Sequence, residues 1–371
     1  MLLSRVFGRI VKGLPFLLSE VRLLISCHTP WMVSVPRSIH LTVTERCNGL
    51  CKMCFVGMNN ADKNFRGQSK VEIPKEDTVR LIREAKELSG SSFYLALIGG
   101  ELLLYHGFAA ALEESRKHNI SLTFTTNGYT LNDTNVNDII RSNPMNVSIS
   151  LESIDPEINE RLRSFKNGTR KTMEGIDRLI KQREANNADF SVIIKSIVTE
   201  VNFRQLPDVV RRYAKIPKVL WNPQPFYHNA DGVAEHMADF SVKDVNELRE
   251  VIDEIKELRR QGYAIVADEE TLENFIDYFR DGLHKERVRH NKRCTLGYTH
   301  MFVSPSGGVI MCPYILKSVG NVFQGQSLKE IWNSPEAKAH REEMASCRIN
   351  CNATCSRPVP FLTKVKTFLR M

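Results

Sequence analysis

Three cysteines lie close together in the stretch Glu45-Arg46-Cys47-Asn48-Gly49-Leu50-Cys51-Lys52-Met53-Cys54. Their spacing is C-x3-C-x2-C, and the stretch directly follows an apolar run that predicts a strand. Three thiolates on one short loop can bind three irons of a [4Fe–4S] cluster, which leaves the fourth iron open to an amine and a carboxylate of a small molecule. A structural zinc site is the alternative, but it needs four ligands, and no fourth cysteine or histidine belongs to this motif.

Apolar, β-like runs alternate with helix-like segments from residue 38 to about residue 226. The predicted strands are 39–44, 93–98, 121–125, 147–151, 191–198 and 219–222. The predicted helices are 75–89, 105–118, 132–141, 156–163, 171–186 and 204–215. Continuous apolar strands joined by helices indicate a parallel sheet that helices cover. Folds of this kind carry their chemistry at the carboxyl ends of the strands, where the cysteine motif lies.

The motif and its place after the first strand resemble those of radical S-adenosylmethionine (SAM) enzymes. The resemblance covers about 38–226 and implies an α/β fold, a partial (β/α)6 TIM-type barrel. It also implies that Cys47, Cys51 and Cys54 hold a SAM-binding [4Fe–4S] cluster. One departure is Met53, because this position is usually aromatic in the family.

Further motifs end the later strands, where the family has its SAM pocket. The residues implied in this way are Gly99, Gly100, Glu101, Thr126, Asn127, Ser150 and Arg163. Residues 99–101 resemble the GGE motif, whose backbone meets the methionyl amino group, and glycine permits such an approach. Ser150 would lie near the ribose. Arg163 matches an arginine that often pairs with the SAM carboxylate, although a surface helix charge is the alternative. Glu152 stands near a position where the family often has aspartate.

A second group of cysteines follows near the end of the chain: Cys294, Cys312, Cys347, Cys351 and Cys355. With the hairpin-like segment 304–312, the run over about 290–357 resembles the SPASM/twitch extension, which binds auxiliary iron–sulfur clusters. A two-cluster domain normally has seven cysteines, so the resemblance implies one auxiliary [4Fe–4S] cluster and a spare cysteine. Cys294 and Cys312 are expected to pair with two of the last three. A zinc ribbon is the alternative.

These patterns predict five regions. They are an N-terminal amphipathic helical segment (1–37), the radical SAM partial barrel (38–230), a helical connecting region (231–289), the SPASM/twitch-like domain (290–357) and a basic amphipathic tail (358–371). In the connecting region we expect a helix over 241–261 that Ser241 caps, a strand over 263–266 and a helix over 269–281. The lone Cys27 is predicted to be a buried small hydrophobe.

The composition of the 371 residues, 42% hydrophobic and 25% charged, is that of a soluble globular protein with two or three domains. No apolar run reaches the roughly 20 residues that span a bilayer. Basic residues dispersed through the first segment argue against a secretory signal. Clustered cysteines are typical of metal binding in a reducing compartment, so we expect a cytoplasmic protein.

The net charge of +8 favours acidic partners. Nucleic acid is not expected, because the sequence has no basic stripe with interleaved aromatic residues. Small concentrations of basic residues lie at both ends, within the amphipathic segment 1–27 and the tail 361–370. Two interpretations of these ends stay open: both helices dock on the protein's own core, or they contact an anionic membrane surface, since an amphipathic pattern alone does not separate the two cases.

The resemblance implies a radical SAM enzyme, expected to be an oxidoreductase, that reductively cleaves SAM to a 5′-deoxyadenosyl radical. That radical abstracts hydrogen from the substrate, and the electron comes from a donor such as flavodoxin or ferredoxin. A small-molecule, lipid or glycan substrate is favoured, because no winged-helix peptide-binding module is evident at the N-terminus. The alternatives are a peptide- or protein-modifying maturase and a non-catalytic redox relay. No general base is identified; Tyr227, His228 and Glu235 are candidates, and ordinary polar loop residues are the other interpretation.

Overall fold

The computed structural model describes residues 18, 20–29, 33–54, 56–57, 71–90, 93–226, 240–281 and 294–347. Its central feature is a nine-stranded sheet in the order β6-β5-β4-β3-β2-β1-β7-β8-β9. The strands are β1 (Ser38–Thr44), β2 (Tyr94–Gly99), β3 (Ser121–Thr126), β4 (Asn146–Ser150), β5 (Ser191–Val198), β6 (Val219–Pro225), β7 (His300–Val303), β8 (Gly308–Ile310) and β9 (Gly320–Asn321). The pairs from β6 to β7 are parallel, and β8 and β9 add antiparallel strands.

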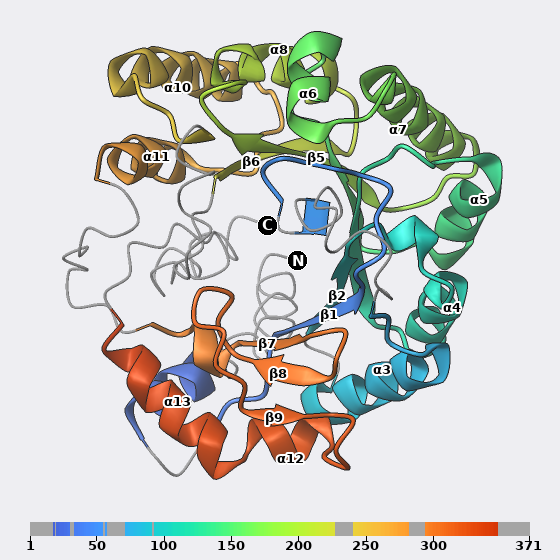
Figure 1. The fold of residues 1–371 in the computed structure, drawn as a ribbon, viewed down its shortest axis with the longest axis vertical. Coiled ribbons are helices and arrows are strands. Elements are labelled where there is room, and N and C mark those ends of the chain that lie inside the picture. Colours follow the sequence, from blue (N-terminus) through green and yellow to red (C-terminus); the bar gives the residue numbers. More distant parts are fainter. Residues whose placement is uncertain are drawn as a thin grey trace, which may run out of the picture.

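Helices follow the strands along the chain and cover the outside of the curved sheet (Figure 1). They are α3 (Lys75–Ser89), α4 (Phe108–Lys117), α5 (Asp133–Ser142), α6 (Pro156–Arg163), α7 (Gly168–Ala185), α8 (Leu206–Tyr213), α10 (Val245–Arg260), α11 (Glu269–Asp281), α12 (Leu328–Trp332) and α13 (Pro335–Ala345). Short 3-10 helices are η1 (Leu102–Leu104), η2 (Phe203–Gln205) and η4 (Leu296–Tyr298). The predicted parallel partial barrel with helices on its outside is confirmed.

The period of two along each strand separates the two faces of the sheet. In β1, Ile39, Leu41 and Val43 are fully buried and belong to the main hydrophobic core under the helices. The intervening side chains, such as His40 and Thr42, therefore point to the inside of the barrel and are only partly buried. The same alternation holds in β3, β5 and β6, whereas Ala96 of β2, Ser148 of β4 and His300 of β7 are buried although they belong to the inner set.

Some predicted elements differ in their ends. The helix expected over 241–261 begins at Val245, because Asp244 and not Ser241 is its cap: the carboxylate accepts from the Asn246 and Glu247 backbone N–H groups at 3.0 and 2.9 Å. The strand expected over 263–266 is wrong, since Ile265 forms only an isolated bridge with Trp221.

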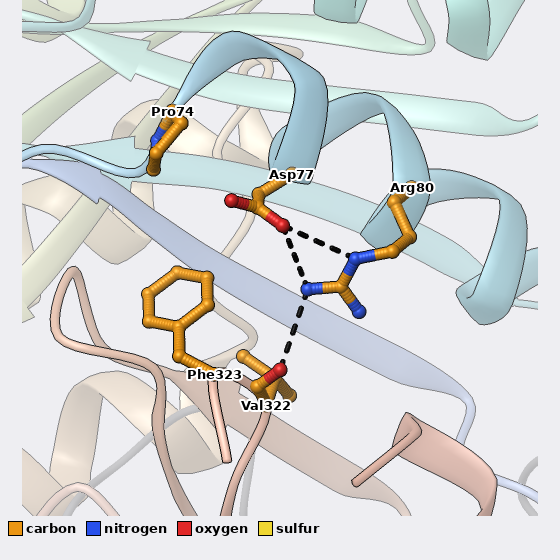
Figure 2. Close-up of a pocket in the computed structure, with 5 residues that line it drawn as sticks. All are labelled: Pro74, Asp77, Arg80, Val322 and Phe323. Carbon is orange, nitrogen blue, oxygen red and sulfur yellow. Dashed lines mark hydrogen bonds and ion pairs between the residues drawn. The ribbon is translucent and has the colours of Figure 1, made fainter. Parts of the chain in front are cut away.

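The C-terminal region extends the barrel sheet, since β7 pairs with β1 in parallel register. Arg80 of α3 joins the two regions: its Nη2 donates to Asp77 Oδ1 at 2.9 Å and to the Val322 carbonyl at 3.3 Å (Figure 2). Beside this contact lies a pocket of about 390 Å³ that Pro74 and Phe323 also line. The predicted boundary between the connecting region and the SPASM/twitch-like domain lies outside the described residues.

Residues 20–28 form a helix before β1. Leu23 and Cys27 pack against Tyr298, which confirms that Cys27 is a buried apolar residue. The remainder of the predicted N-terminal helical segment, residues 1–17, and the tail 358–371 lie outside the described residues. Among the helices that the structure describes, none is long and apolar enough to cross a membrane.

Two histidines face each other inside the sheet where β1 meets β7. The rings of His40 and His300 stack with centroids 5.7 Å apart. Burial, together with smaller contributions from repulsion by His300 and Lys195, lowers the pKa of His40 to about 3. Burial alone lowers the pKa of His300 to about 4. Both imidazoles are therefore neutral in the folded chain at neutral pH.

The free energy of unfolding is accordingly expected to fall as the pH drops below about 6.5, because these two imidazoles bind protons in the unfolded chain and stay neutral in the folded chain. At pH 5 the loss is about 2 kcal/mol for each histidine. Urea unfolding at pH 7.5, 6 and 5 measures this loss. The double variant His40→Gln/His300→Gln should lose about 4 kcal/mol less over that interval than the native chain. Equal losses in both chains would show that these histidines do not carry the effect.

Candidate functional site

The loop with Cys47, Cys51 and Cys54 leaves the carboxyl end of β1 and is tied to α6. Cys54 N donates to the Cys51 carbonyl at 3.1 Å, which closes a turn, and Lys52 N donates to the Leu162 carbonyl at 3.1 Å. Cys51 is buried, Cys47 is half-buried and Cys54 is exposed. The loop thus turns two thiols inward and leaves the third at its rim.

Burial and neighbouring charges change the pKa values of the thiols in this loop. The pKa of Cys47 is raised to about 12, mainly by burial; a hydrogen bond from Gly49 N opposes the rise, and the charges of Glu101, Cys51 and Cys54 add to it. Burial also raises the pKa of Cys51, and the guanidinium of Arg163 opposes this. Without a metal these two thiols are therefore protonated at neutral pH. A cation at this place would convert them to thiolates and release protons.

The donor set suits a cluster. Within the residues that the structure describes, no three His, Cys, Asp or Glu side chains gather closely enough to hold one metal ion. A [4Fe–4S] cluster takes each thiolate on a different iron, so its thiolates stand farther apart than the ligands of a single ion. Glycine at position 49 allows the loop to pass under the Phe165 ring, since a Cβ there would lie 2.8 Å from that ring and 3.4 Å from Cys51 Sγ. Three thiols in one loop, with Arg163 as nearby positive charge, fit this group.

Gly99 and Gly100 bring the end of β2 against the cysteine loop. Gly100 N donates to the Thr44 carbonyl and Glu101 N to the Arg46 carbonyl, both at 2.7 Å. A Cβ on Gly99 would lie 2.6 Å from the Thr44 oxygen, and one on Gly100 2.3 Å from the Arg46 oxygen. Glycine is therefore needed here because two backbone segments approach each other closely. From the sequence, the same glycines were explained by the approach of the backbone to a ligand.

Gly100→Ala is expected to push the cysteine loop away from β2, because its Cβ cannot fit beside the Arg46 carbonyl. We expect SAM affinity to fall about tenfold or more, since misplacement by about 1 Å at a site typically has an effect of this size or larger. Calorimetric titration of the reconstituted protein with SAM measures it. Gly308→Ala, whose Cβ would meet no atom closer than 3.2 Å, is the matched control. A Gly100→Ala protein with native SAM affinity would contradict the close-approach argument.

Glu101 joins β2 to β3 through its carboxylate, which is fully buried. It accepts from Thr126 Oγ1 at 2.5 Å, from Asn127 N at 2.7 Å and from Leu103 N at 3.1 Å. Asn127 Nδ2 in turn donates to Asn48 Oδ1 of the cysteine loop at 2.8 Å. Glu101, Thr126 and Asn127 are thus brought together as predicted, and the carboxylate is held by the protein's own donors.

Arg163 and Glu152 form a buried ion pair beside the loop. Arg163 Nη1 donates to Glu152 Oε1 at 2.6 Å, and Ile197 N donates to Glu152 Oε2 at 2.6 Å. The side chains are 10% and 1% exposed, so the interpretation of Arg163 as a surface charge is wrong. Ser150 ends β4 close by. The role of Arg163 toward the SAM carboxylate stays a prediction; the sequence pointed to Glu152 at the end of the same strand as Ser150 but not to its pairing with Arg163.

Several residues of the site carried no sequence signal. Asn48 is a variable position of the motif, yet it links the loop to β3. Phe165 stacks on Tyr129 at 4.9 Å between centroids and lies over Gly49. Met53, the departure from the family pattern, packs with Leu162 and Phe226 beneath the loop. Such contacts join distant segments and cannot be found from spacing.

Family comparisons agree with this geometry. A model described as the radical SAM superfamily matches residues 41–200, and the SPASM model, an iron-sulfur cluster-binding domain, matches residues 294–356. The chain belongs to the radical SAM superfamily. It carries a C-terminal SPASM iron–sulfur domain. Its cofactors are SAM with the radical SAM [4Fe–4S] cluster and a SPASM auxiliary iron–sulfur cluster, and enzymes of this class need a reductant.

Individual relatives are distant. This radical SAM chain is 22% identical over 321 residues to the AdoMet-dependent heme synthase of Methanosarcina barkeri (strain Fusaro / DSM 804), covering 82% of this chain and 84% of that protein. It shares its fold with Streptococcus suis SuiB bound to S-adenosylmethionine (TM-score 0.63, 17% identity, 83% of this chain and 68% of SuiB). It is also similar in fold to anSMEcpe with bound AdoMet (TM-score 0.58, 16% identity, 85% and 81%).

The SPASM cysteines are only partly described. Cys294 and Cys312 are buried and Cys347 is half-buried. Tyr314 N donates to Cys312 Sγ at 3.4 Å. Cys351 and Cys355 lie outside the described residues, so the predicted pairing of Cys294 and Cys312 with two of the last three cysteines stays a prediction. The candidate bases Tyr227, His228 and Glu235 also lie outside.

Proposed function

We propose that this chain is a radical SAM enzyme that abstracts hydrogen from a small polar substrate with an anionic group, held inside the barrel. The substrate is a small molecule or the polar part of a lipid or glycan.

Cys47, Cys51 and Cys54 hold the SAM-binding cluster. The SAM pocket comprises Gly99, Gly100, Glu101, Thr126, Asn127, Ser150 and Arg163. One auxiliary [4Fe–4S] cluster takes its ligands from Cys294, Cys312, Cys347, Cys351 and Cys355. The chemistry that the cluster and SAM supply when bound is one-electron cleavage of SAM to a 5′-deoxyadenosyl radical.

The chain's own residues prepare this site. Burial of Cys47 and Cys51 shields the bound group from water, and the Arg163 guanidinium balances negative charge beside it. Glu101 fixes the ends of β2 and β3 relative to the cysteine loop. The proposed electron donor, a flavodoxin or ferredoxin, would approach the rim, where Cys54 is exposed.

The interior wall carries the argument for the substrate class. The nine described strands contain no Asp or Glu, and Lys195 is their one Lys or Arg. Many inward positions carry hydroxyl or amide groups, namely Thr42, Thr123, Thr125, Asn146, Ser148, Ser150, Asn222 and Gln224; Ile98, Ile193, Ile197 and Leu220 are apolar members of the same set. A wall of neutral hydrogen-bonding groups with a cation suits hydroxyl and carboxylate or phosphate groups.

Lys195 stands at the level of the site. Its Cα is in register with Ser150 of β4 and with Asn222 of β6, and its Nζ donates to Thr125 Oγ1 at 3.4 Å. Ser150 is the last residue of β4, so Lys195 lies near the carboxyl edge where SAM is proposed to bind. The buried carboxylates of Glu101 and Glu152 are both held by donors of the protein, Thr126 and Asn127 for the first and Arg163 and Ile197 for the second.

A peptide- or protein-modifying maturase is the second candidate, and two proteins of similar fold support it. SuiB has been seen bound to the precursor peptide SuiA, and anSMEcpe to peptides. The heme synthase relative points the other way, toward a non-peptide substrate. A redox relay without SAM chemistry is the third candidate.

The deciding experiment has two steps. The protein is reconstituted anaerobically with iron and sulfide and given dithionite and SAM, and 5′-deoxyadenosine is quantified by mass spectrometry. Product that depends on dithionite is expected; its absence together with absent SAM binding would favour the redox relay. The protein is then offered fractions of a fully deuterated microbial extract, separated into anionic small molecules, neutral and cationic small molecules, lipids, and peptides.

Deuterium in 5′-deoxyadenosine is expected with an anionic small-molecule fraction or a polar lipid fraction. Transfer from peptides alone would establish the maturase. With the active fraction, Lys195→Met should raise the amount needed for half-maximal transfer about tenfold or more and leave substrate-free SAM cleavage unchanged. Lys329→Met, an exposed lysine of α12, is the matched control. Equal behaviour of the two variants would remove Lys195 from substrate binding.

A further inference from the structure

The helix of residues 20–28 is apolar on two sides. Its inner side packs by Leu23 and Cys27 against Tyr298. Its outer side leaves Leu18, Val21, Leu24 and Ile25 exposed by 59, 45, 51 and 41%. These are four of the nine large apolar side chains that stand exposed in the described residues, and helical spacing puts them in one stripe with Arg22 and His28. A stripe of this kind on a fixed helix indicates a contact surface.

The charge of the chain is concentrated next to this helix in sequence and at the other end. Residues 1–19 contain three basic and no acidic side chains, and residues 344–371 contain five basic and no acidic side chains. Together they account for the whole net charge of +8, so residues 20–343 are neutral in sum. The charge is thus a property of the two ends and not of the barrel.

We propose that the outer face of helix 20–28 docks on an anionic lipid bilayer surface. Its apolar side chains would enter the interface, and the exposed Arg22 beside them would contact acidic headgroups. Apolar burial and electrostatic attraction are the two signals that together hold a peripheral protein on a membrane, where one alone binds marginally. An acidic protein partner is the other occupant that this charge could suit, and in that case the chain would not bind vesicles.

The docking face is separate from the cysteine loop. Glu20 of the helix is paired with Arg37, next to the first residue of β1, and Ser34 Oγ donates to the Tyr298 carbonyl at 2.5 Å. The cysteine loop leaves the other end of β1. Seven residues at roughly 3.3 Å each separate the two ends by about 20 Å. Substitutions on the outer face therefore leave the cofactor site intact.

The test is flotation of the reconstituted full chain with vesicles of phosphatidylglycerol and phosphatidylcholine in a one-to-two ratio, and with pure phosphatidylcholine vesicles. We expect the chain to bind the mixed vesicles and to bind the neutral vesicles about tenfold or more weakly. Binding to the mixed vesicles should weaken about tenfold when salt rises from about 0.1 to 0.5 M. The double variant Leu24→Asp/Ile25→Asp should reduce the partition coefficient about tenfold or more.

Met145→Asp/Leu316→Asp is the matched control, because it charges two exposed apolar side chains, 45 and 59% exposed, elsewhere on the molecule. It should bind as the native chain does. Circular dichroism and iron content show whether each variant folds, and Leu24→Gln/Ile25→Gln replaces the first variant if it does not. No vesicle binding, equal binding to neutral vesicles, or binding that survives the outer-face substitutions would overturn the proposal. So would a dimer in light scattering that the same substitutions dissociate, because a second copy would then cover the face.

Discussion

Cys54→Ala is expected to abolish 5′-deoxyadenosine formation, with a fall of at least about a thousandfold. Each thiolate of the loop is proposed to hold a different iron, so losing one would leave the cluster with two attachments and SAM with no fixed iron to bind. Cys54 is the most informative of the three because it is exposed. Its truncation makes no cavity and leaves the fold intact. Iron should fall by about four atoms per chain, with the auxiliary cluster retained.

The control for this variant is Cys27→Ala, which removes a thiol that is 5% exposed and packs against Leu23 and Tyr298. It should keep native iron content and native 5′-deoxyadenosine formation and lose only about 1 kcal/mol of stability. Mass spectrometry of the product and colorimetric iron determination provide the two readouts. A Cys54→Ala protein with full iron content and native product formation would show that the loop does not hold the cluster.

Arg163→Met is expected to lower the free energy of unfolding by about 3–5 kcal/mol, because it leaves the carboxylate of Glu152 buried without its counter-ion. The carboxylate keeps one donor, Ile197 N at 2.6 Å, which does not neutralise it. The double variant Glu152→Gln/Arg163→Met removes the buried charge together with its partner. It should therefore be more stable than Arg163→Met alone.

Urea unfolding of the reconstituted proteins measures these differences. Arg170→Met breaks an exposed Arg–Glu pair, with 67 and 54% of the two side chains exposed, and should cost about 0.5 kcal/mol or less. The same proteins titrated with SAM distinguish two roles of Arg163. If the guanidinium serves SAM more than Glu152, SAM affinity will collapse while stability changes little, and the ion pair will not be the main role of this residue.

Local patterns of the sequence predicted the barrel well. The apolar alternation of 39–44 and 191–198 depends on neighbours two residues apart, and the structure has strands there. Helix ends were less certain, because several polar residues can cap a helix and only the geometry of the chain decides among them. Asp244 rather than Ser241 caps α10 because its side chain reaches the Asn246 and Glu247 N–H groups.

The sequence by itself determined the class of chemistry: three thiols within eight residues after a strand need only local geometry to offer a cluster its ligands. The tertiary structure alone decided how that loop is supported. Glu152 meets Arg163, Glu101 meets Thr126, and β7 adds itself to β1 through contacts between segments far apart in the chain. These contacts form only when the strands assemble and bury polar groups. A buried carboxylate without a hydrogen-bonding partner would cost free energy, so each one is paired in the folded chain. Spacing along the chain does not encode that choice, whereas the assembled sheet brings each of these groups to one partner.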